Sequence, residues 1–148
     1  MAGIYIHIPY CKKKCIYCDF YFKINADDMR DMISCIKKEL ITRKNYVKAR
    51  QVKTIYFGGG TPSLLTNHYV KTILKTIYDN YKVSEKPEIT IEANPDDLNR
   101  KKIADFFNSG VNRLSIGVQS FKDDDLIFLN RSHSRADAIR SIKMAQEI

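Results

Sequence analysis

The sequence predicts an α/β fold, namely a partial open barrel in which about four βα units build a parallel sheet. Two observations support this prediction. Strand-like and helix-like segments alternate along the 148 residues without tight hairpins, which favours right-handed βαβ units. Three of the predicted strands also have one apolar and one polar face, whereas a flat sheet covered by helices on both sides is apolar on both. A curved sheet with a polar concave side that holds a ligand explains this pattern better.

The first predicted unit contains a strand, a loop and a helix. Residues 4–8 alternate with a period of two, as in a strand, and Pro9 ends it. Residues 11–24 are expected to form a cysteine-bearing loop. Residues 25–28 supply a capping side chain and acids at a helix start, and apolar residues follow at helical spacing: Met29, Met32, Ile33, Ile36 and Leu40.

Three further strand and helix pairs follow along the chain. Their strands are predicted over residues 52–57, 88–92 and 113–118, and their helices over 66–80, 99–108 and from about Ser134 to Ile148. Four units do not close a barrel, and the fourth strand leaves an apolar edge, which natural proteins avoid. We therefore expect residues 1–148 to be the N-terminal part of a core domain whose remainder, with a C-terminal domain, lies outside this chain.

The polar faces of the predicted strands collect several chemically useful side chains. Tyr5 and His7 oppose the isoleucines of the first strand, and Glu92 opposes Ile91 in the third. In the fourth strand the polar face continues through Ser115 and Gln119. These side chains are expected to point into the concave side of the barrel.

Composition and charge restrict the class of protein. The chain has 25 Lys and Arg against 17 Asp and Glu, and 44% hydrophobic residues are enough for a buried core. An apolar run of about 18 residues, as a membrane span requires, is absent, and the N-terminus lacks the features of a signal peptide. A cytoplasmic location is therefore expected. Residues 1–57 carry 12 basic and 5 acidic side chains, so most of the net charge of +8 lies there.

Three of the four cysteines form a compact motif. Cys11, Cys15 and Cys18 have the spacing C-x3-C-x2-C, while Cys35 stands apart. Without a secretory signal, such spacing favours a metal or redox site over disulfides. Soft thiolates this close suit an iron–sulfur cluster or zinc. Three thiolates on a [4Fe–4S] cluster leave one iron open, and that iron can bind a ligand through amino and carboxylate groups.

Zinc is the alternative that the cysteine spacing leaves open. A structural zinc site usually has four ligands, and His7, Asp19 or Cys35 can be considered as the fourth. Zinc pairs normally occur as C-x2–4-C with a distant second pair, which makes this the less favoured interpretation. Cys35 is instead expected to be a small buried hydrophobic residue of an amphipathic helix.

The motifs together resemble a known family. The cysteine motif after a first strand and the glycine-rich end of the second strand are similar to those of radical S-adenosylmethionine (SAM) enzymes. Five motifs resemble the oxygen-independent coproporphyrinogen III oxidase group and, within it, HemW-type haem chaperones. They lie at residues 5–11, 18–20, 58–63, 92–95 and 117–121. The resemblance implies a partial (βα)6 radical SAM barrel, and the chain covers well under half of a typical family member.

The resemblance also implies cofactors and the residues that bind them. Cys11, Cys15 and Cys18 would hold a [4Fe–4S] cluster, and reduction of that cluster would cleave SAM to a 5′-deoxyadenosyl radical. The implied SAM contacts are Tyr5, Tyr17, Gly59, Gly60, Thr61, Glu92, Gln119 and Arg131. Glycine allows a ligand to approach the main chain, and Tyr17 would lie against the adenine. No residue of this chain is assigned a catalytic role.

Two departures favour the haem chaperone branch over the oxidases. Decarboxylating oxidases carry a further cysteine two residues after the third ligand, where this chain has Phe20. Their third-strand motif tends toward acid-Pro, where this chain has Asn94-Pro95. The resemblance therefore implies haem binding and transfer, with the haem site beyond Ile148. An oxygen-independent coproporphyrinogen III oxidase remains the alternative.

The predicted partners follow from charge and from the family. The positive field near Lys12–Lys14 should favour an acidic electron donor such as a flavodoxin or ferredoxin, although the same residues suit a simply solvated loop. Haem or a porphyrin, and a haem-accepting protein, are implied by the resemblance. A zinc-stabilised basic nucleic-acid module is a distant alternative. The sequence lacks interleaved aromatic residues and a recognition helix, so no nucleic-acid partner is expected.

Overall fold

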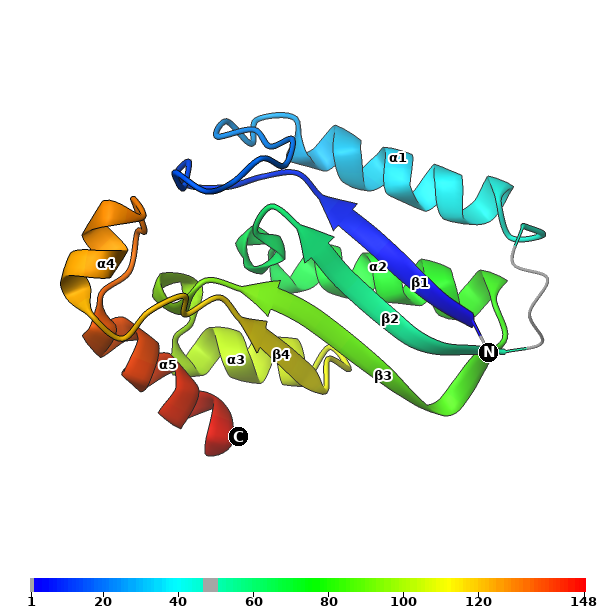
Figure 1. Cartoon of the computed structure of the whole chain (residues 1–148). Coiled ribbons are helices and arrows are strands. Elements are labelled where there is room, and N and C mark those ends of the chain that lie inside the picture. Colours follow the sequence, from blue (N-terminus) through cyan, green and yellow to red (C-terminus); the bar gives the residue numbers. More distant parts are fainter. Residues whose placement is uncertain (1, 47–50) are drawn as a thin grey trace.

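The computed structural model describes residues 2–46 and 51–148 and contains one parallel four-stranded sheet with helices (Figure 1). The strands are β1 (Ala2–Ile8), β2 (Val52–Gly59), β3 (Val83–Ala93) and β4 (Arg113–Ile116), paired in chain order. The helices are α1 (Met29–Thr42), α2 (Asn67–Asn80), α3 (Arg100–Phe107), α4 (Asp123–Phe128) and α5 (Arg135–Gln146). Short 3₁₀ turns, η1 (Pro62–Leu64) and η2 (Pro95–Asp97), follow β2 and β3. The predicted α/β fold with successive βα units is confirmed.

The apolar face of the sheet is covered by helices. In Figure 1, α1, α2 and α3 lie on one side of the strands. Ile55, Phe57 and Ile91 of the sheet are fully buried, and they pack in one core with helix residues such as Ile73 and Ile103. Burial of a side chain of this size stabilises the fold by roughly 1.5–3 kcal/mol, so this face holds the layers together.

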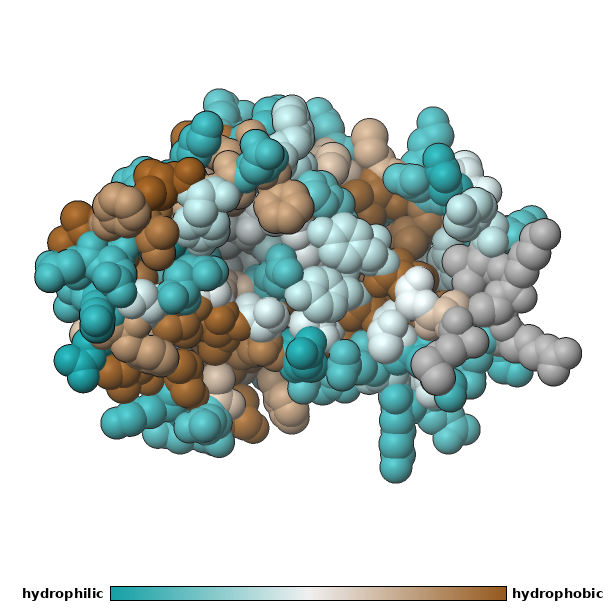
Figure 2. Space-filling view, in the orientation of Figure 1, coloured by the Kyte–Doolittle hydropathy of each residue, from teal (hydrophilic) through white to brown (hydrophobic). Residues whose placement is uncertain are grey.

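The opposite face of the sheet is polar, as the alternation predicts. Tyr5 and His7 are exposed whereas their neighbours Ile6 and Ile8 are buried. The strand register places Tyr5 beside Tyr56 and Glu92 beside Ser115. Figure 2 shows the corresponding surface, with pale and teal side chains over the middle of the sheet. Among the described residues, no helix covers this face.

Several element boundaries differ from the sequence expectations, among them those of β3 and β4. The strand β3 begins at Val83 rather than at Glu88, and β4 ends at Ile116 rather than at Val118. The sequence does not predict the earlier start of β3, because residues 85 and 86 are charged and residue 87 is proline. After Ile116 the backbone turns locally, because Val118 N donates to Ile116 O at 3.0 Å and Ser120 N donates to Val118 O at 2.8 Å.

The N-terminus of α1 lacks the side-chain capping bond that the sequence predicts. Asp28 occupies the N-cap position but makes no side-chain capping bond. Its carboxylate instead accepts hydrogen bonds from Tyr10 Oη at 2.8 Å and Lys23 Nζ at 2.6 Å. Burial and the hydrogen bond to Asp28 raise the pKa of Tyr10 to about 12. The hydrogen bonds from Lys23 and Tyr10 lower the pKa of Asp28. The helix start therefore fixes the two ends of the cysteine loop.

One element of the structure has no counterpart in the sequence prediction, and one expectation is wrong. The short helix α4 is not predicted, because six residues beginning with Asp123-Asp124-Asp125 carry too little apolar periodicity. Its three acids suit the positive end of the helix dipole. Cys35 is exposed on α1, so the prediction that it is buried is wrong. Among the described residues, no helix has the length and apolar character needed to cross a membrane.

Candidate functional site

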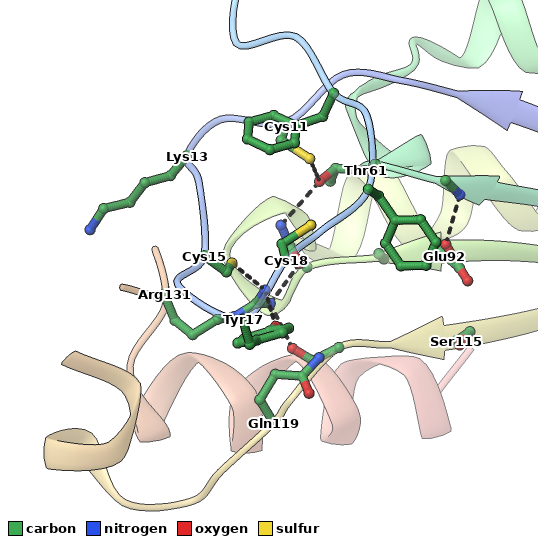
Figure 3. A pocket seen from close by; sticks show the side chains of 17 residues that line it. Cys11, Lys13, Cys15, Tyr17, Cys18, Thr61, Glu92, Ser115, Gln119 and Arg131 are labelled. Atoms are coloured by element: carbon green, nitrogen blue, oxygen red, sulfur yellow. Dashed lines mark hydrogen bonds between the residues drawn. The ribbon is translucent and has the colours of Figure 1, made fainter. Parts of the chain in front are cut away.

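A cavity of about 250 Å³ lies at the carboxyl ends of the strands, where parallel α/β sheets bind ligands (Figure 3). Its walls come from the cysteine loop, the glycine-rich end of β2, the ends of β3 and β4, and the segment around Arg131. All three motif cysteines line it, with seven of the eight residues proposed to contact SAM: Tyr17, Gly59, Gly60, Thr61, Glu92, Gln119 and Arg131. The structure thus brings together residues that are more than a hundred positions apart.

The cysteine loop is closed at its base by backbone hydrogen bonds. Lys23 N donates to Pro9 O at 2.7 Å, and Cys11 N donates to Lys23 O at 3.0 Å. A tight turn follows within the loop, because Cys18 N donates to Cys15 O at 3.1 Å. The C-x3-C-x2-C spacing therefore directs three thiols toward one cavity, and all three are partly exposed to it.

Two of the sulfur atoms receive hydrogen bonds from distant residues. Thr61 Oγ1 donates to Cys11 Sγ at 3.4 Å, and Arg131 Nη1 donates to Cys15 Sγ at 3.2 Å. Burial raises the pKa of the Cys11 thiol, while Thr61 and the positive charge of Arg131 act in the opposite direction. Both donors favour the charged sulfur that a metal requires.

The thiols surround the cavity without meeting at one point. Within residues 2–46 and 51–148, no three His, Cys, Asp or Glu side chains are placed around a single metal-ion position. A zinc ion needs its donors at one centre, with sulfur atoms about 2.3 Å from it. In an iron–sulfur cube each thiolate binds a different iron, so three thiols spaced around a cavity fit that donor set.

The end of β2 passes close beneath the cysteine loop. A Cβ atom at Gly60 would lie 2.7 Å from Tyr10 O and 3.0 Å from Cys11 Sγ, so only glycine fits there. Gly60 N donates to Ile8 O and Thr61 N donates to Tyr10 O. Gly59 N donates to Glu92 Oε2 at 3.1 Å. Because these amides are used within the protein, the backbone groups that this segment can offer a ligand are carbonyl oxygens.

Glu92 lies at the end of β3 with a fixed carboxylate. Its Oε1 accepts from Tyr56 Oη at 2.7 Å, and its Oε2 accepts from the Gly59 amide. Burial and the Glu92 hydrogen bond raise the pKa of Tyr56, and burial with the Glu92 charge raises that of Tyr5. A carboxylate has about four acceptor positions, so Glu92 keeps capacity for a ligand hydroxyl or ammonium group.

Arg131 connects the separate walls of the cavity. Besides Cys15, its guanidinium donates to Tyr17 Oη at 3.2 Å, Asn94 Oδ1 at 2.7 Å and Gly117 O at 2.8 Å. Asn94 in turn donates from Nδ2 to Thr61 Oγ1 at 3.3 Å. Asn94 was not among the predicted site residues. Its position two residues after Glu92, at the strand end, is the signal that identifies it.

Gln119 and Tyr5 occupy contrasting positions. Gln119 lines the cavity and holds a φ of 65°, a conformation that few residues other than glycine adopt. Tyr5 does not line the cavity. Its ring stacks on Tyr56 with centroids 6.0 Å apart, and its hydroxyl lies 3.2 Å from His7 Nδ1. Tyr5 therefore belongs to the polar sheet face next to the cavity rather than to its wall.

Comparisons with known proteins agree on one family. The family model for the Radical SAM superfamily matches residues 5–148. A Buchnera aphidicola (subsp. Schizaphis graminum) protein named heme chaperone HemW is 40% identical over 148 residues, covering 99% of this chain and 39% of that protein. A Danio rerio protein named radical S-adenosyl methionine domain-containing protein 1, mitochondrial, is 37% identical over 148 residues, covering 99% of this chain and 33% of that relative.

A solved structure has the same arrangement of elements. The coproporphyrinogen III oxidase HemN from Escherichia coli superposes with a TM-score of 0.88 at 26% sequence identity. The match covers 98% of this chain and 34% of that chain. The chain thus spans between about a third and two-fifths of the length of these similar proteins.

Proposed function

This chain belongs to the radical SAM superfamily and is related to HemW and HemN, and we propose that its cavity binds one [4Fe–4S] cluster together with SAM. Cys11, Cys15 and Cys18 would hold the cluster. One observation carries the proposal. The three thiols of a local motif line the same cavity as seven proposed SAM contacts drawn from five separate segments.

The side chains around the thiols suit a negatively charged cluster. The Arg131 guanidinium and the Thr61 hydroxyl donate to sulfur atoms, and hydrogen bonds to ligating sulfur atoms stabilise the charge they carry. When bound and reduced, the cluster supplies the electron that cleaves a sulfur–carbon bond of SAM. The protein's part is to hold the thiols, orient the ligand and shield the cavity.

The remaining residues would orient SAM. Backbone carbonyl oxygens of Gly59 and Gly60 would accept from a ligand ammonium, and Glu92, held by the Gly59 amide, would offer a carboxylate beside them. The Tyr17 ring would lie against the adenine, and Gln119 would contact the ligand from the end of β4. Tyr5 would act from the adjacent polar face, on a part of the ligand that extends along the sheet.

The finer assignment is to haem trafficking, as a HemW-like protein that binds and transfers haem. The names of the relatives and the residues Phe20 and Asn94 support it. Haem or a porphyrin, a haem-accepting protein and an acidic electron donor would be its partners. The structural similarity to HemN supports the alternative, an oxygen-independent coproporphyrinogen III oxidase. Oxidative decarboxylation of coproporphyrinogen III by the protein would favour the alternative, and haem transfer without it would favour the first.

We further propose that residues 1–148 form the N-terminal part of a radical SAM core domain. Within the described residues, β4 is an edge of the sheet, and a largely apolar cavity runs beside it between α3 and α5. Leu114 and Ile116 line this cavity together with Phe106 and Ile142. Further strands and helices of the same domain would cover these side chains.

Anaerobic reconstitution tests the cofactor proposal. We expect a brown protein with thiolate-to-iron absorbance and four irons per chain, as a [4Fe–4S] cluster requires. The absorbance should be lost in the variants Cys11→Ala, Cys15→Ala and Cys18→Ala. Cys35→Ala is the matched control and should keep it, because Cys35 lies on α1 outside the cavity. A colourless protein with stoichiometric zinc would contradict the proposal.

A further inference from the structure

Lys12 lies inside the cysteine motif, and its side chain is anchored to a distant segment. Its Nζ donates to Asp96 Oδ2 at 2.9 Å and forms a second ion pair with Asp97 Oδ1. Both aspartates belong to η2, directly after β3. The three lysines therefore differ in their contacts: all three are exposed, but Lys12 forms two ion pairs.

The ion pair between Lys12 and Asp97 connects the cysteine loop to the buried interior of the molecule. The Asp97 side chain is only 2% exposed, and its Oδ2 accepts from Ser63 Oγ at 2.6 Å. Ser63 is fully buried, and its oxygen also accepts from Asn94 N at 3.3 Å. A buried carboxylate needs a cationic partner as well as hydrogen bonds. Lys12 supplies that positive charge from the cysteine loop.

A second set of contacts holds the same loop from the other side. Asn130 Nδ2 donates to Lys14 O at 2.6 Å, and Ile16 N donates to Leu129 O at 3.2 Å. Ser132 Oγ donates to Asp96 Oδ1 at 3.0 Å, which links this segment to the partner of Lys12. The backbone between Cys11 and Cys15 is thus held between η2 and residues 129–132.

We propose that Lys12 is a positioning residue, whose ion pairs with Asp96 and Asp97 hold the cysteine loop in the geometry that retains the cluster. This inference rests on the proposed function, since it concerns the same three thiols. Its effect is separate from that of the thiols themselves, because Lys12 does not line the cavity. Without the anchor, the segment between Cys11 and Cys15 opens more often and releases the cluster faster.

The test compares Lys12→Met with Lys14→Met in the reconstituted protein. Lys14 is the matched control, because its side chain is exposed and only its carbonyl is held. We expect the rate of cluster loss to a chelator to rise about tenfold in Lys12→Met, which corresponds to about 1.4 kcal/mol of lost local stability. Lys14→Met should match the unsubstituted protein. Lys12→Arg should retain the cluster as the unsubstituted protein does. SAM should change the electron paramagnetic resonance spectrum of the cluster less in Lys12→Met than in Lys14→Met or Lys12→Arg.

A second variant serves as a control for misfolding of Lys12→Met. Lys12→Met removes the ion-pair partner of the buried Asp97, whereas Lys12→Met with Asp97→Asn removes both charges of the pair. The double variant should fold and still lose the cluster about tenfold faster. In the cluster-free protein, alkylation of the three thiols should also be faster in both variants. Equal cluster loss and alkylation in Lys12→Met and Lys14→Met, or retention in the double variant, would overturn the inference. Failure of the unsubstituted protein to take up iron would instead count against the proposed function.

Discussion

Arg131 shows how one side chain defines the chemistry of the cavity. It donates to a sulfur, a phenol, a side-chain amide and a backbone carbonyl, and these acceptors come from three different segments. The planar guanidinium can reach all of them at once because it carries five donors in a fixed fork. A lysine would keep the positive charge but act only as a point charge. Geometry rather than charge is therefore the property that this position requires.

We predict that Arg131→Lys weakens SAM binding by about tenfold or more. The substitution should also lower the free energy of unfolding by roughly 1–3 kcal/mol, because acceptors such as Asn94 Oδ1 lose their donor. Isothermal titration of SAM into the reconstituted protein and thermal unfolding measure the two effects. Arg135→Lys, at the exposed start of α5, is the control and should change neither. Unchanged SAM affinity in Arg131→Lys would show that charge alone suffices.

Single residues also mark the limit of prediction from sequence. The cysteine motif is local, so its spacing alone identifies the three thiols. Glu92 and Gln119 were placed on the polar strand face by their alternation. Asn94 joins the site only through contacts with Thr61 and Arg131, 33 and 37 positions away, and such contacts depend on the strand register. The pairing of Lys12 with η2, across 84 positions, is hidden for the same reason.

At the scale of elements, the apolar periodicity of the sequence predicts those strands and helices that are stabilised by burial of an apolar face. The four strands and the helices α1, α2, α3 and α5 all have an apolar face that packs into the core, and the sequence predicts each of them. The short helix α4 buries only Leu126, so its formation depends on contacts with neighbouring segments rather than on its own pattern. Its backbone continues into Leu129 and Asn130, which hold the cysteine loop.

The capping box at the start of α5 provides a test at this scale. Ser134 and Asp137 exchange side-chain and backbone hydrogen bonds, and these bonds lower the pKa of Asp137. We predict that Ser134→Ala lowers the free energy of unfolding by about 1 kcal/mol, as expected for loss of an N-cap. Ser34→Ala, at an exposed position inside α1, is the control and should not destabilise the protein.

The same box predicts a pH dependence with a definite sign. Because the folded pKa of Asp137 is lowered, its stabilisation is fully present above the unfolded value near 3.9 and is lost as the pH falls through the lower folded value. Ser134→Ala should therefore lose less stability than the unsubstituted protein over this acidic range. Denaturant unfolding at several pH values measures the difference, and parallel curves would contradict the assignment.

At the scale of the whole molecule, the three lysines of the cysteine loop lie beside the cavity, and Lys13 lines it. Lys12 is compensated by two aspartates, whereas Lys13 and Lys14 are exposed. In Figure 3 the side chain of Lys13 extends away from the three sulfur atoms. The charge that an approaching protein meets beside the cysteine loop therefore comes from Lys13 and Lys14. This modifies the sequence expectation, in which all three lysines contributed.

We predict that Lys13→Glu with Lys14→Glu slows reduction of the cluster by an acidic flavodoxin or ferredoxin and flattens the dependence of the rate on salt. Stopped-flow reduction at several ionic strengths is the measurement. Lys38→Glu with Lys71→Glu is the control, because these exposed lysines lie on α1 and α2, away from the cavity. Equal effects of the two double variants would mean that overall charge, and not this site, sets the rate.

The hydrogen bond between Arg131 and Cys15 joins residues 116 positions apart, and this separation has a consequence during synthesis on the ribosome. The three cysteines leave the ribosome early, while the guanidinium that binds one of them follows much later. At roughly 5–20 residues per second, the delay is on the order of ten seconds. Throughout that time the nascent chain presents Cys15 without this donor and without a finished cavity. Insertion of the proposed cluster would therefore take place either in an open peptide or, after this delay, in a folded acceptor.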